Sequence, residues 1–455
     1  MKATNGREPL AVAHVKPAMR RRPVLIRAHQ DEPDGENRHR GRLGRFLSVL
    51  GPGLITGASD DDPAGIITYA TAGASLGFAM LWTALFTIPL MLAMQFISAR
   101  IGLVQRNGIA GVIKQAYGRS WIIYPAAILV LVANTVNLGA DIGAIAQAIQ
   151  IDTGIPARWL IIPVTLIIVL TLTFGSFKII STIFKWLTLP LLAYIAAAFL
   201  AHPSGWSILK YTLIPHVSFT KAYLTTFVAI LGTTITPYLW FWQANLEVEA
   251  TKTAQRASVQ TRDVSEVMIR RSIWDISAGI GLSNLVFFAI IVATGSTLFQ
   301  SGHHHIASSA DAAKALAPAA GGLATLLFTV GIIGAGTLAV PVLAGSASYA
   351  VGESLGWQVG IDRPWYRAKA FYAVIAAACL IGMLINFTRI SAVSALFYSA
   401  VINGLIAPPL MVVIMLVANN ERVMGRQVNS RVVNVVGWSA TLIMGAAAIL
   451  MLVTI

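Results

Sequence analysis

Apolar residues recur along almost the whole chain in runs of about 20 residues or more, the length at which an α-helix crosses a bilayer. The first, sixth, eighth and tenth runs are longer than the others or contain Gly, Pro or polar residues. The pattern predicts an all-α integral membrane protein that crosses the bilayer eleven times. The eleven predicted segments are 48–75, 77–100, 121–149, 158–176, 179–201, 222–245, 274–299, 320–350, 368–387, 390–418 and 433–455.

Composition supports this reading, because 56% of the residues are hydrophobic and 11% are charged, against about 25% charged in soluble domains. The net charge of +14 would also suit a nucleic-acid partner. If the segments alternate in direction, however, 27 of the 33 Lys and Arg residues fall on one side and 5 on the other. This asymmetry is typical of the cytoplasmic face of a membrane protein. We therefore expect a multi-pass protein of a bacterial-type inner membrane, with a cytoplasmic N-terminus, the lipid bilayer as partner and no nucleic acid.

The chain divides into four parts. Residues 1–46 are polar and basic and predict a disordered cytoplasmic tail, which either attracts anionic lipid or only sets the topology. Residues 47–201 and 202–418 form two blocks of five helices, and residues 419–455 form a cytoplasmic loop and the eleventh helix. Nothing in the sequence sets the oligomeric state.

The first helix of each five-helix block contains a proline near its middle, with polar residues around it. Pro63 cannot donate a hydrogen bond to the carbonyl of Ser59, and Pro237 cannot donate one to the carbonyl of Thr233. In a bilayer such a carbonyl must face protein or a water-filled cavity. We therefore expect residues 60–65 and the surroundings of Pro237 to be unwound. Two interrupted helices at corresponding positions of two blocks are typical of a transporter that binds its substrate near the midplane.

The first break carries three consecutive carboxylates, Asp60, Asp61 and Asp62. A buried carboxylate is costly unless it is paired or coordinates a metal, and segments one, three, six, eight and ten contain no Lys or Arg that could neutralise Asp62. A cation held by Asp62 and by the carbonyls of Ser59 and Thr233 would do so. The alternatives are that the aspartates are protonated or cap the second half-helix, a role that suits Asp60 or Asp61.

Further polar residues lie at membrane depth. Asn134, Asn137 and Asp141 share one helical face and either line an ion path or form interhelical hydrogen bonds. Asn403 is a further candidate for the path through its amide oxygen.

Two features follow the second break. Tyr238 and Gln243 can gate the path, although aromatic packing near the membrane interface explains the aromatic side chains there as well. The acidic residues at 247–249 either attract cations at the exit of the path or form a solvated helix end, and the second is the expected role.

The stretch "GPGLITGASDDDPAG", residues 51–65, resembles the first-helix motif of the Nramp family of divalent-metal transporters. The triplet at 236–238 occupies the place of the family's Met-Pro-His. The resemblance implies eleven helices in a leucine-transporter-type fold, with a five-plus-five inverted repeat, one extra helix, and helices one and six unwound at the midplane. It also implies a protein without enzymatic activity or cofactor, in which the divalent metal ion is the transported substrate.

The resemblance assigns the metal ligands one by one. The family's aspartate corresponds to Asp62, and its two backbone carbonyls correspond to those of Ser59 and Thr233. The position of its asparagine is Gly65, which has no amide oxygen, and the position of its methionine is Thr236, which offers a hydroxyl in place of a thioether. A thioether favours soft or borderline metals, so its absence favours a harder ion.

The resemblance also suggests how transport is driven. The family's histidine is replaced by Tyr238, and its acidic pair falls at Asn137 and Ala140. The chain is therefore similar to a divergent branch of Nramp-related magnesium transporters, which implies uptake of partly hydrated Mg²⁺, with Mn²⁺ also accepted, by alternating access without proton coupling. The alternatives are a proton-coupled Mn²⁺/Fe²⁺ transporter of the ordinary type and a sodium-coupled organic-solute symporter of the same fold.

Overall fold

The structure is a computed structural model. It describes residues 56–57, 59–118, 120–174, 192–257, 266–361 and 363–454. The predicted tail at residues 1–46 lies outside these ranges, as do the start of segment one and most of segment five. The described residues form helices, turns and loops with no strand among them, as expected for an all-α fold.

Eight helices of the described part are long and apolar enough to cross a membrane. They are α4 (Leu81–Gln105), α6 (Ser120–Thr153), α7 (Ala157–Phe174), the pair α11 and α12 (Lys221–Thr234 and Pro237–Ala257), α13 (Glu266–Thr294), α16 (Ala324–Leu355), α18 (Ala392–Ala418) and α20 (Arg431–Thr454). The shorter helices α3 (Pro63–Leu76), α9 (Ala193–Leu200) and α17 (Lys369–Ile385) fall in the three other predicted segments. Each of the eleven apolar segments therefore contains a helix.

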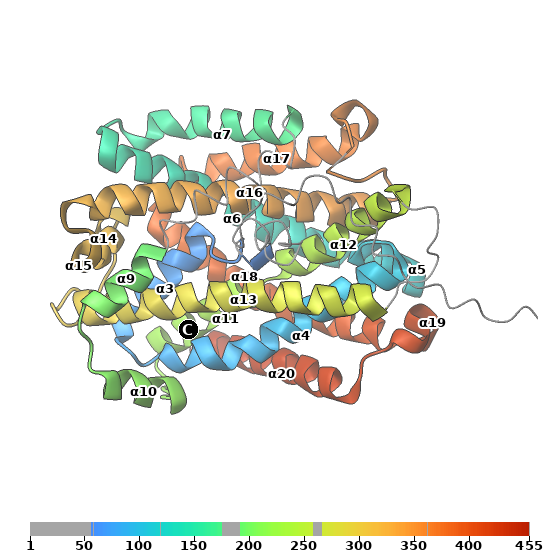
Figure 1. Cartoon of the computed structure of the whole chain (residues 1–455). Coiled ribbons are helices and arrows are strands. Elements are labelled where there is room, and N and C mark those ends of the chain that lie inside the picture. Colours follow the sequence, from blue (N-terminus) through green and yellow to red (C-terminus); the bar gives the residue numbers. More distant parts are fainter. Residues whose placement is uncertain are drawn as a thin grey trace, which may run out of the picture. The chain divides into compact units, whose positions relative to one another are not determined.

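The connections contain short helices that the apolar pattern did not predict. Figure 1 shows α5 and α19 at one end of the long helices, and α10, α14 and α15 at the other. This division agrees with the alternating direction of the predicted segments. The elements are α5 (Ile109–Tyr117), α10 (Gly205–Leu213), α14 (Ser309–Ala313), η3 (Lys314–Leu316), α15 (Ala317–Ala320), η5 (Trp365–Arg367), α19 (Glu421–Met424) and η6 (Gly425–Gln427). Two others lie within predicted segments: η2 (Gly295–Phe299) ends the seventh and η4 (Gly321–Leu323) is at the start of the eighth.

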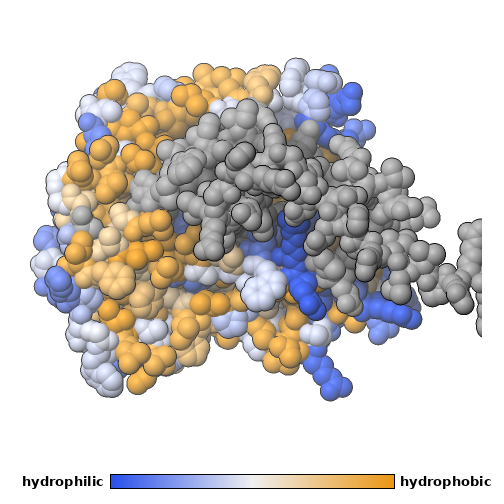
Figure 2. Space-filling view, viewed as in Figure 1, coloured by the Kyte–Doolittle hydropathy of each residue, from blue (hydrophilic) through white to orange (hydrophobic). Residues whose placement is uncertain are grey.

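The outer surface is apolar where lipid would contact it. Figure 2 shows hydrophobic residues spread over much of the visible face. Large apolar side chains such as Trp121, Trp159, Leu166 and Val453 are more than half exposed. A soluble protein rarely exposes apolar surface on this scale, so the surface agrees with a multi-pass membrane protein.

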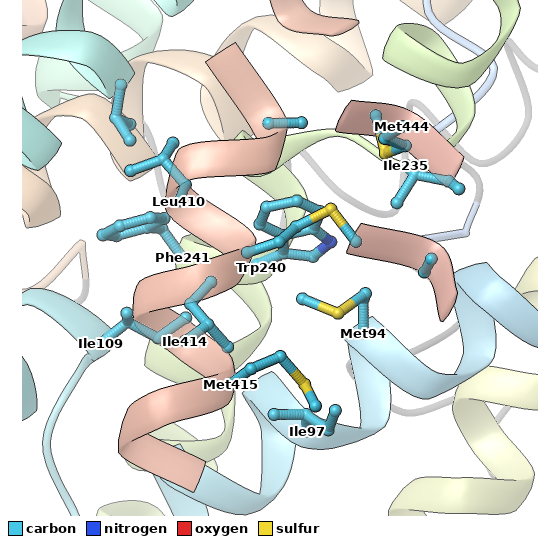
Figure 3. Close-up of a cluster of buried hydrophobic side chains, with 14 of the residues drawn as sticks. Met94, Ile97, Ile109, Ile235, Trp240, Phe241, Leu410, Ile414, Met415 and Met444 are labelled. Carbon is cyan, nitrogen blue, oxygen red and sulfur yellow. The ribbon is translucent and has the colours of Figure 1, made fainter. Parts of the chain in front are cut away.

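A buried cluster holds the second half of the broken sixth segment in place. Trp240 and Phe241 of α12 meet Leu410 and Ile414 of α18 and Met94 of α4 in this cluster (Figure 3). Because lipid tails are as apolar as these side chains, close van der Waals packing rather than the hydrophobic effect stabilises such contacts in a membrane. The start of α12 is therefore fixed against two other helices.

Glycines bring α11 and α18 into backbone contact. A Cβ atom placed on Gly232 would lie 2.0 Å from the carbonyl oxygen of Ala400 and 2.3 Å from the amide nitrogen of Gly404. Small residues allow this approach between membrane helices. The contact fixes the last turn of α11, directly before the second break.

Both predicted breaks are present. Helix α11 ends at Thr234, Ile235 and Thr236 lie outside the helices, and α12 begins at Pro237. In the first segment, α3 begins at Pro63. Each proline is the first residue of its half-helix, a position where the missing N–H costs nothing.

One detail of the first break differs from the sequence prediction. The unwound part of the first segment ends at Asp62, so Gly65 lies in the first turn of α3 rather than in the break. Helices α16 and α18 continue through Pro341 and through the pair at 408–409. Pro63 and Pro237 start new helices, whereas the prolines inside α16 and α18 leave those helices continuous. A helix can continue past an interior proline in a membrane because neighbouring helices satisfy the backbone groups that the proline frees.

Candidate ion-binding site

The Asp62 carboxylate lies where the first break meets α6 and α12, and the residue is 1% exposed. Its Oδ1 accepts a hydrogen bond from the backbone N–H of Gly65 at 2.6 Å. Its Oδ2 lies 2.9 Å from the donor Nδ2 of Asn137 and 3.2 Å from the hydroxyl of Tyr238. That hydroxyl is also 3.3 Å from the carbonyl oxygen of Ser59, and with one proton it donates to one of the two oxygens at a time. The hydroxyl of Tyr238 therefore reaches the candidate site, which aromatic packing near the membrane interface does not account for.

Asp62 is also the N-cap of α3, and the prediction that Asp60 or Asp61 caps this half-helix is wrong. Pro63 occupies the first helical position, so the capping position falls to the residue directly before it. The two roles use different oxygens, because Oδ1 bonds the helix N-terminus while Oδ2 faces α6 and α12.

The second break lies directly against the first. A Cβ atom placed on Gly65 would lie 3.1 Å from Oγ1 of Thr233, 3.3 Å from the carbonyl oxygen of Asp60 and 3.3 Å from Oδ1 of Asp62. Oxygen atoms of both breaks therefore surround position 65. Thr236 is 1% exposed, and its Oγ1 has no hydrogen-bond partner among the described residues.

The polar face of α6 divides into different roles. Asn134 donates to the carbonyl oxygen of Leu343 at 2.9 Å and to Oγ of Ser346 at 2.6 Å, both on α16, so it forms interhelical hydrogen bonds. Asn137 donates to the site carboxylate and accepts a hydrogen bond from Ser399 of α18 at 2.7 Å. It thus connects the first break with α18.

Asp141 and Asn403 are buried polar residues without full hydrogen bonding. Asp141 is 0% exposed, and neither of its carboxylate oxygens has a hydrogen-bond partner within the part of the chain that the structure describes. The same holds for Oδ1 of Asn403, which lies one helical turn after Ser399 on α18. Their roles in an ion path stay predictions.

Asp60 and Asp61 face α13 rather than α6. The hydroxyl oxygen of Ser283 lies 2.9 Å from Oδ2 of Asp60 and 3.1 Å from Oδ1 of Asp61. The two aspartates are 1% and 4% exposed. The three carboxylates of the first break therefore do not converge on one point.

A polar chain leads from Asp60 along α12. Asp60 and Gln243 line a small cavity of about 10 Å³, and Oε1 of Gln243 accepts a hydrogen bond from Thr56 at 2.6 Å. Nε2 of Gln243 donates to Glu247 at 3.0 Å, and Ser272 donates to the same carboxylate. Glu247 is only 6% exposed, so the prediction of a solvated helix end is wrong at this position.

Three residues near the first break were not expected from the sequence, namely Gln95, Ser283 and Ser399. Each is a polar residue inside an apolar segment, which is the only signal that the sequence offers. The signal is weak because Ser and Thr in membrane helices often bond their own backbone, as Ser98 does to the carbonyl oxygen of Met94.

The arrangement around Asp62 suits a hard cation. Its candidate ligands are oxygens, and no described Lys or Arg forms an ion pair with Asp62 or Asp141. Within the described ranges, no group of three or more His, Cys, Asp or Glu side chains could enclose a metal ion. One carboxylate with neutral oxygens fits temporary binding of a cation better than a permanent structural metal.

The chain resembles known transporters over nearly its whole length. A family model described as natural resistance-associated macrophage protein-like (Nramp) matches residues 53–454. Proteins named divalent metal cation transporter MntH are similar in sequence. That of Deinococcus radiodurans is 24% identical, with 90% of this chain and 93% of the relative covered. That of Vibrio campbellii is 27% identical, with 86% and 89% covered.

Solved structures show the same fold. A manganese transporter of Eremococcus coleocola, in complex with an aromatic bis-isothiourea substituted compound, aligns with a TM-score of 0.73 at 19% identity, covering 91% of this chain and 88% of that one. Mhp1, a nucleobase-cation-symport-1 family transporter in a closed conformation, aligns with a TM-score of 0.52 at 14% identity. The expected leucine-transporter-type fold is thereby confirmed.

Proposed function

The chain belongs to the natural resistance-associated macrophage protein-like (Nramp) family, and from this we infer that it carries divalent metal cations across a membrane. We propose that the ion binds between the two helix breaks, at the Asp62 carboxylate, the carbonyls of Ser59 and Thr233 and the hydroxyl of Thr236. The observation that carries this proposal is a buried carboxylate at the junction of both breaks with no described cationic side chain paired to it. A divalent cation supplies the missing charge.

The proposed substrate is partly hydrated Mg²⁺, with Mn²⁺ also accepted. Carboxylate, carbonyl and hydroxyl ligands suit Mg²⁺ and Mn²⁺, whereas softer metals prefer sulfur or imidazole. Gly65 and Thr236 are small, which leaves space for water molecules that Mg²⁺ releases reluctantly.

We further propose that transport does not require proton coupling. Tyr238 occupies the position of the histidine in the family's sixth-helix motif. Asn137, rather than an acidic residue, contacts Asp62. Neither side chain titrates near neutral pH. Proton-coupled Mn²⁺ transport is the second candidate, and the observation that favours it is the buried carboxylate of Asp141 on the same face of α6.

Ion flux into proteoliposomes tests substrate and coupling together. We expect Mg²⁺ and Mn²⁺ to enter vesicles that contain the protein and Cd²⁺ to enter poorly, because the site lacks a sulfur ligand. The internal pH should stay constant during uptake. Metal-sensitive and pH-sensitive dyes inside the vesicles measure both quantities.

A matched pair of variants serves as the control for the selectivity. Thr236→Met adds a thioether and should raise Cd²⁺ uptake relative to Mg²⁺, whereas Thr236→Val removes only the hydroxyl and should not. Strong Cd²⁺ uptake by the unmodified protein would contradict the magnesium proposal. Acidification that follows metal entry in proportion would instead support the proton-coupled alternative.

We propose that the protein lies in a bacterial-type inner membrane with its N-terminus in the cytoplasm. The ends of the long helices that carry α5 and α19 then also face the cytoplasm, in agreement with the Lys and Arg asymmetry. Because Cys379 is the single cysteine and is buried, cysteines introduced at exposed positions can be labelled selectively. In intact cells an impermeant maleimide should label His305→Cys and not Ser430→Cys. The reverse pattern would show the opposite orientation.

A further inference from the structure

Asp60 and Asp61 form a carboxylate pair that the Asp62 site does not use. Both side chains meet the same hydroxyl of Ser283, on α13, whereas Asp62 contacts α6 and α12. The two carboxylate oxygens that approach this hydroxyl lie at most about 6 Å apart, since each is about 3 Å from the same Oγ atom. Divalent cations in proteins are commonly held by one or two carboxylates together with water.

The pair lacks compensation by other protein groups. Ser283 has one hydroxyl proton and so can donate to one of the two carboxylates at a time. Oδ1 of Asp60 is buried without a hydrogen-bond partner in the described part of the chain, and no described Lys or Arg is paired with either aspartate. Two ionised carboxylates so far from water need a positive charge close by.

An independent observation points to a ligand at this place. Gln95 of α4 is 4% exposed, its Oε1 has no hydrogen-bond partner within the described ranges, and its side chain lines the same small cavity as Asp60. The other polar side chains of the lining are Thr56 and Gln243. A volume of about 10 Å³ is enough for about one water-sized group. Asp60 of the first break and Gln95 of α4, each with one buried side-chain oxygen that has no partner in the described part of the chain, thus line one small cavity.

We propose that Asp60, Asp61 and Gln95 form a second binding station for a divalent cation, next to the Asp62 site. Asp60 and Asp61 supply the charge, and Gln95 supplies a neutral oxygen from α4. The hydrogen-bonded chain from Gln243 to Glu247 continues from this station along α12. Repulsion between ions at adjacent sites helps each one to leave, as in multi-ion conduction, so an ion at the station would ease the release of an ion from Asp62. This inference rests on the proposed function for the identity of the ion, although the station itself can be tested separately.

Mn²⁺ binding to the full purified chain, measured by equilibrium dialysis and by the paramagnetic signal of the bound ion, tests the station. The Asp62→Asn variant removes the charge of the first site, so we expect it still to bind one Mn²⁺ per chain. Adding Asp60→Asn and Asp61→Asn to this variant should abolish binding. Adding Gln95→Leu instead should weaken binding by about tenfold, as the loss of a supporting group does in metal sites, whereas Gln300→Leu, an exposed position, should change nothing.

Each outcome decides between the two proposals. If Asp62→Asn binds no Mn²⁺ while the unmodified protein binds one, the second station does not exist, as would be the case if the pair shared a proton. If Asp62→Asn binds one Mn²⁺ and the Asp60→Asn, Asp61→Asn variant binds none, the station stands and the proposed Asp62 site fails. Should the multiple variants fail to fold, Gln95→Leu against Gln300→Leu in the Asp62→Asn background gives the same decision, because only a station at this cavity makes their affinities differ.

Discussion

Replacing Asp62 by asparagine should reduce metal uptake into proteoliposomes by more than about 100-fold. The substitution removes the one carboxylate charge between the two breaks but keeps a side chain of the same shape that can still accept the hydrogen bond from Gly65. Removing one partner of a buried charge pair costs about 3–5 kcal/mol, and each 1.4 kcal/mol is a factor of about ten in affinity. Initial rates of Mn²⁺ and Mg²⁺ entry measure the effect.

Stability separates this loss from misfolding. Without bound metal, the asparagine variant should unfold at the same temperature as the unmodified protein or higher, because it no longer buries an unpaired charge. Asp311→Asn is the matched control, since Asp311 lies outside the spanning helices and pairs with Lys314 at 2.9 Å. It should leave uptake unchanged. Uptake by Asp62→Asn at more than half the normal rate would show that the ion does not bind at this carboxylate.

The helix breaks were predictable because they depend on backbone chemistry. A proline removes one N–H at a known position, and the consequences for Ser59 and Thr233 follow without any knowledge of the neighbouring helices. The structure places both breaks where the sequence predicted them, apart from the extent of the first. Polar neighbours and corresponding positions in the two blocks singled out Pro63 and Pro237, since a proline that starts a helix and one inside a helix, such as Pro341, otherwise look alike in sequence.

The partners of the site were less predictable because they depend on packing. Ser283 meets Asp60 and Asp61 only because α13 lies beside the first break. Ser399 reaches Asn137 only because α18 crosses α6. A hydroxyl in an apolar helix has several possible partners, including its own backbone, so spacing along the chain cannot select among them. The polar face of α6 was visible in sequence, but the division of its asparagines between α16 and the first break was not.

The burial of Glu247 could not be predicted from the sequence either, for the same reason. Its acidic neighbourhood in sequence suggested solvent, yet the side chain accepts hydrogen bonds from Gln243 and Ser272 and is almost fully buried. Position near the end of an apolar segment therefore does not establish exposure when another helix covers that end.

Replacing Gly232 by alanine should destabilise the protein strongly and lower transport as well. The added Cβ would lie 2.0 Å from the carbonyl oxygen of Ala400 and 2.3 Å from the amide nitrogen of Gly404, and neither backbone atom can move alone. Helices α11 and α18 must therefore separate. Overpacking typically costs about 1–3 kcal/mol, and we expect the upper end here, seen as an apparent melting temperature several degrees lower in detergent.

Transport should fall with it, because the last turn of α11 carries Thr233 into the site. Gly281→Ala makes the same chemical change inside α13, where a Cβ would meet nothing within 4 Å. Alanine favours a helix over glycine by about 1 kcal/mol, so this control should be at least as stable as the unmodified protein and should transport normally. Equal melting temperatures for the two variants would mean that α11 and α18 are not in backbone contact. Lower stability of Gly232→Ala with unchanged uptake would instead show that the last turn of α11 does not position a ligand for the ion.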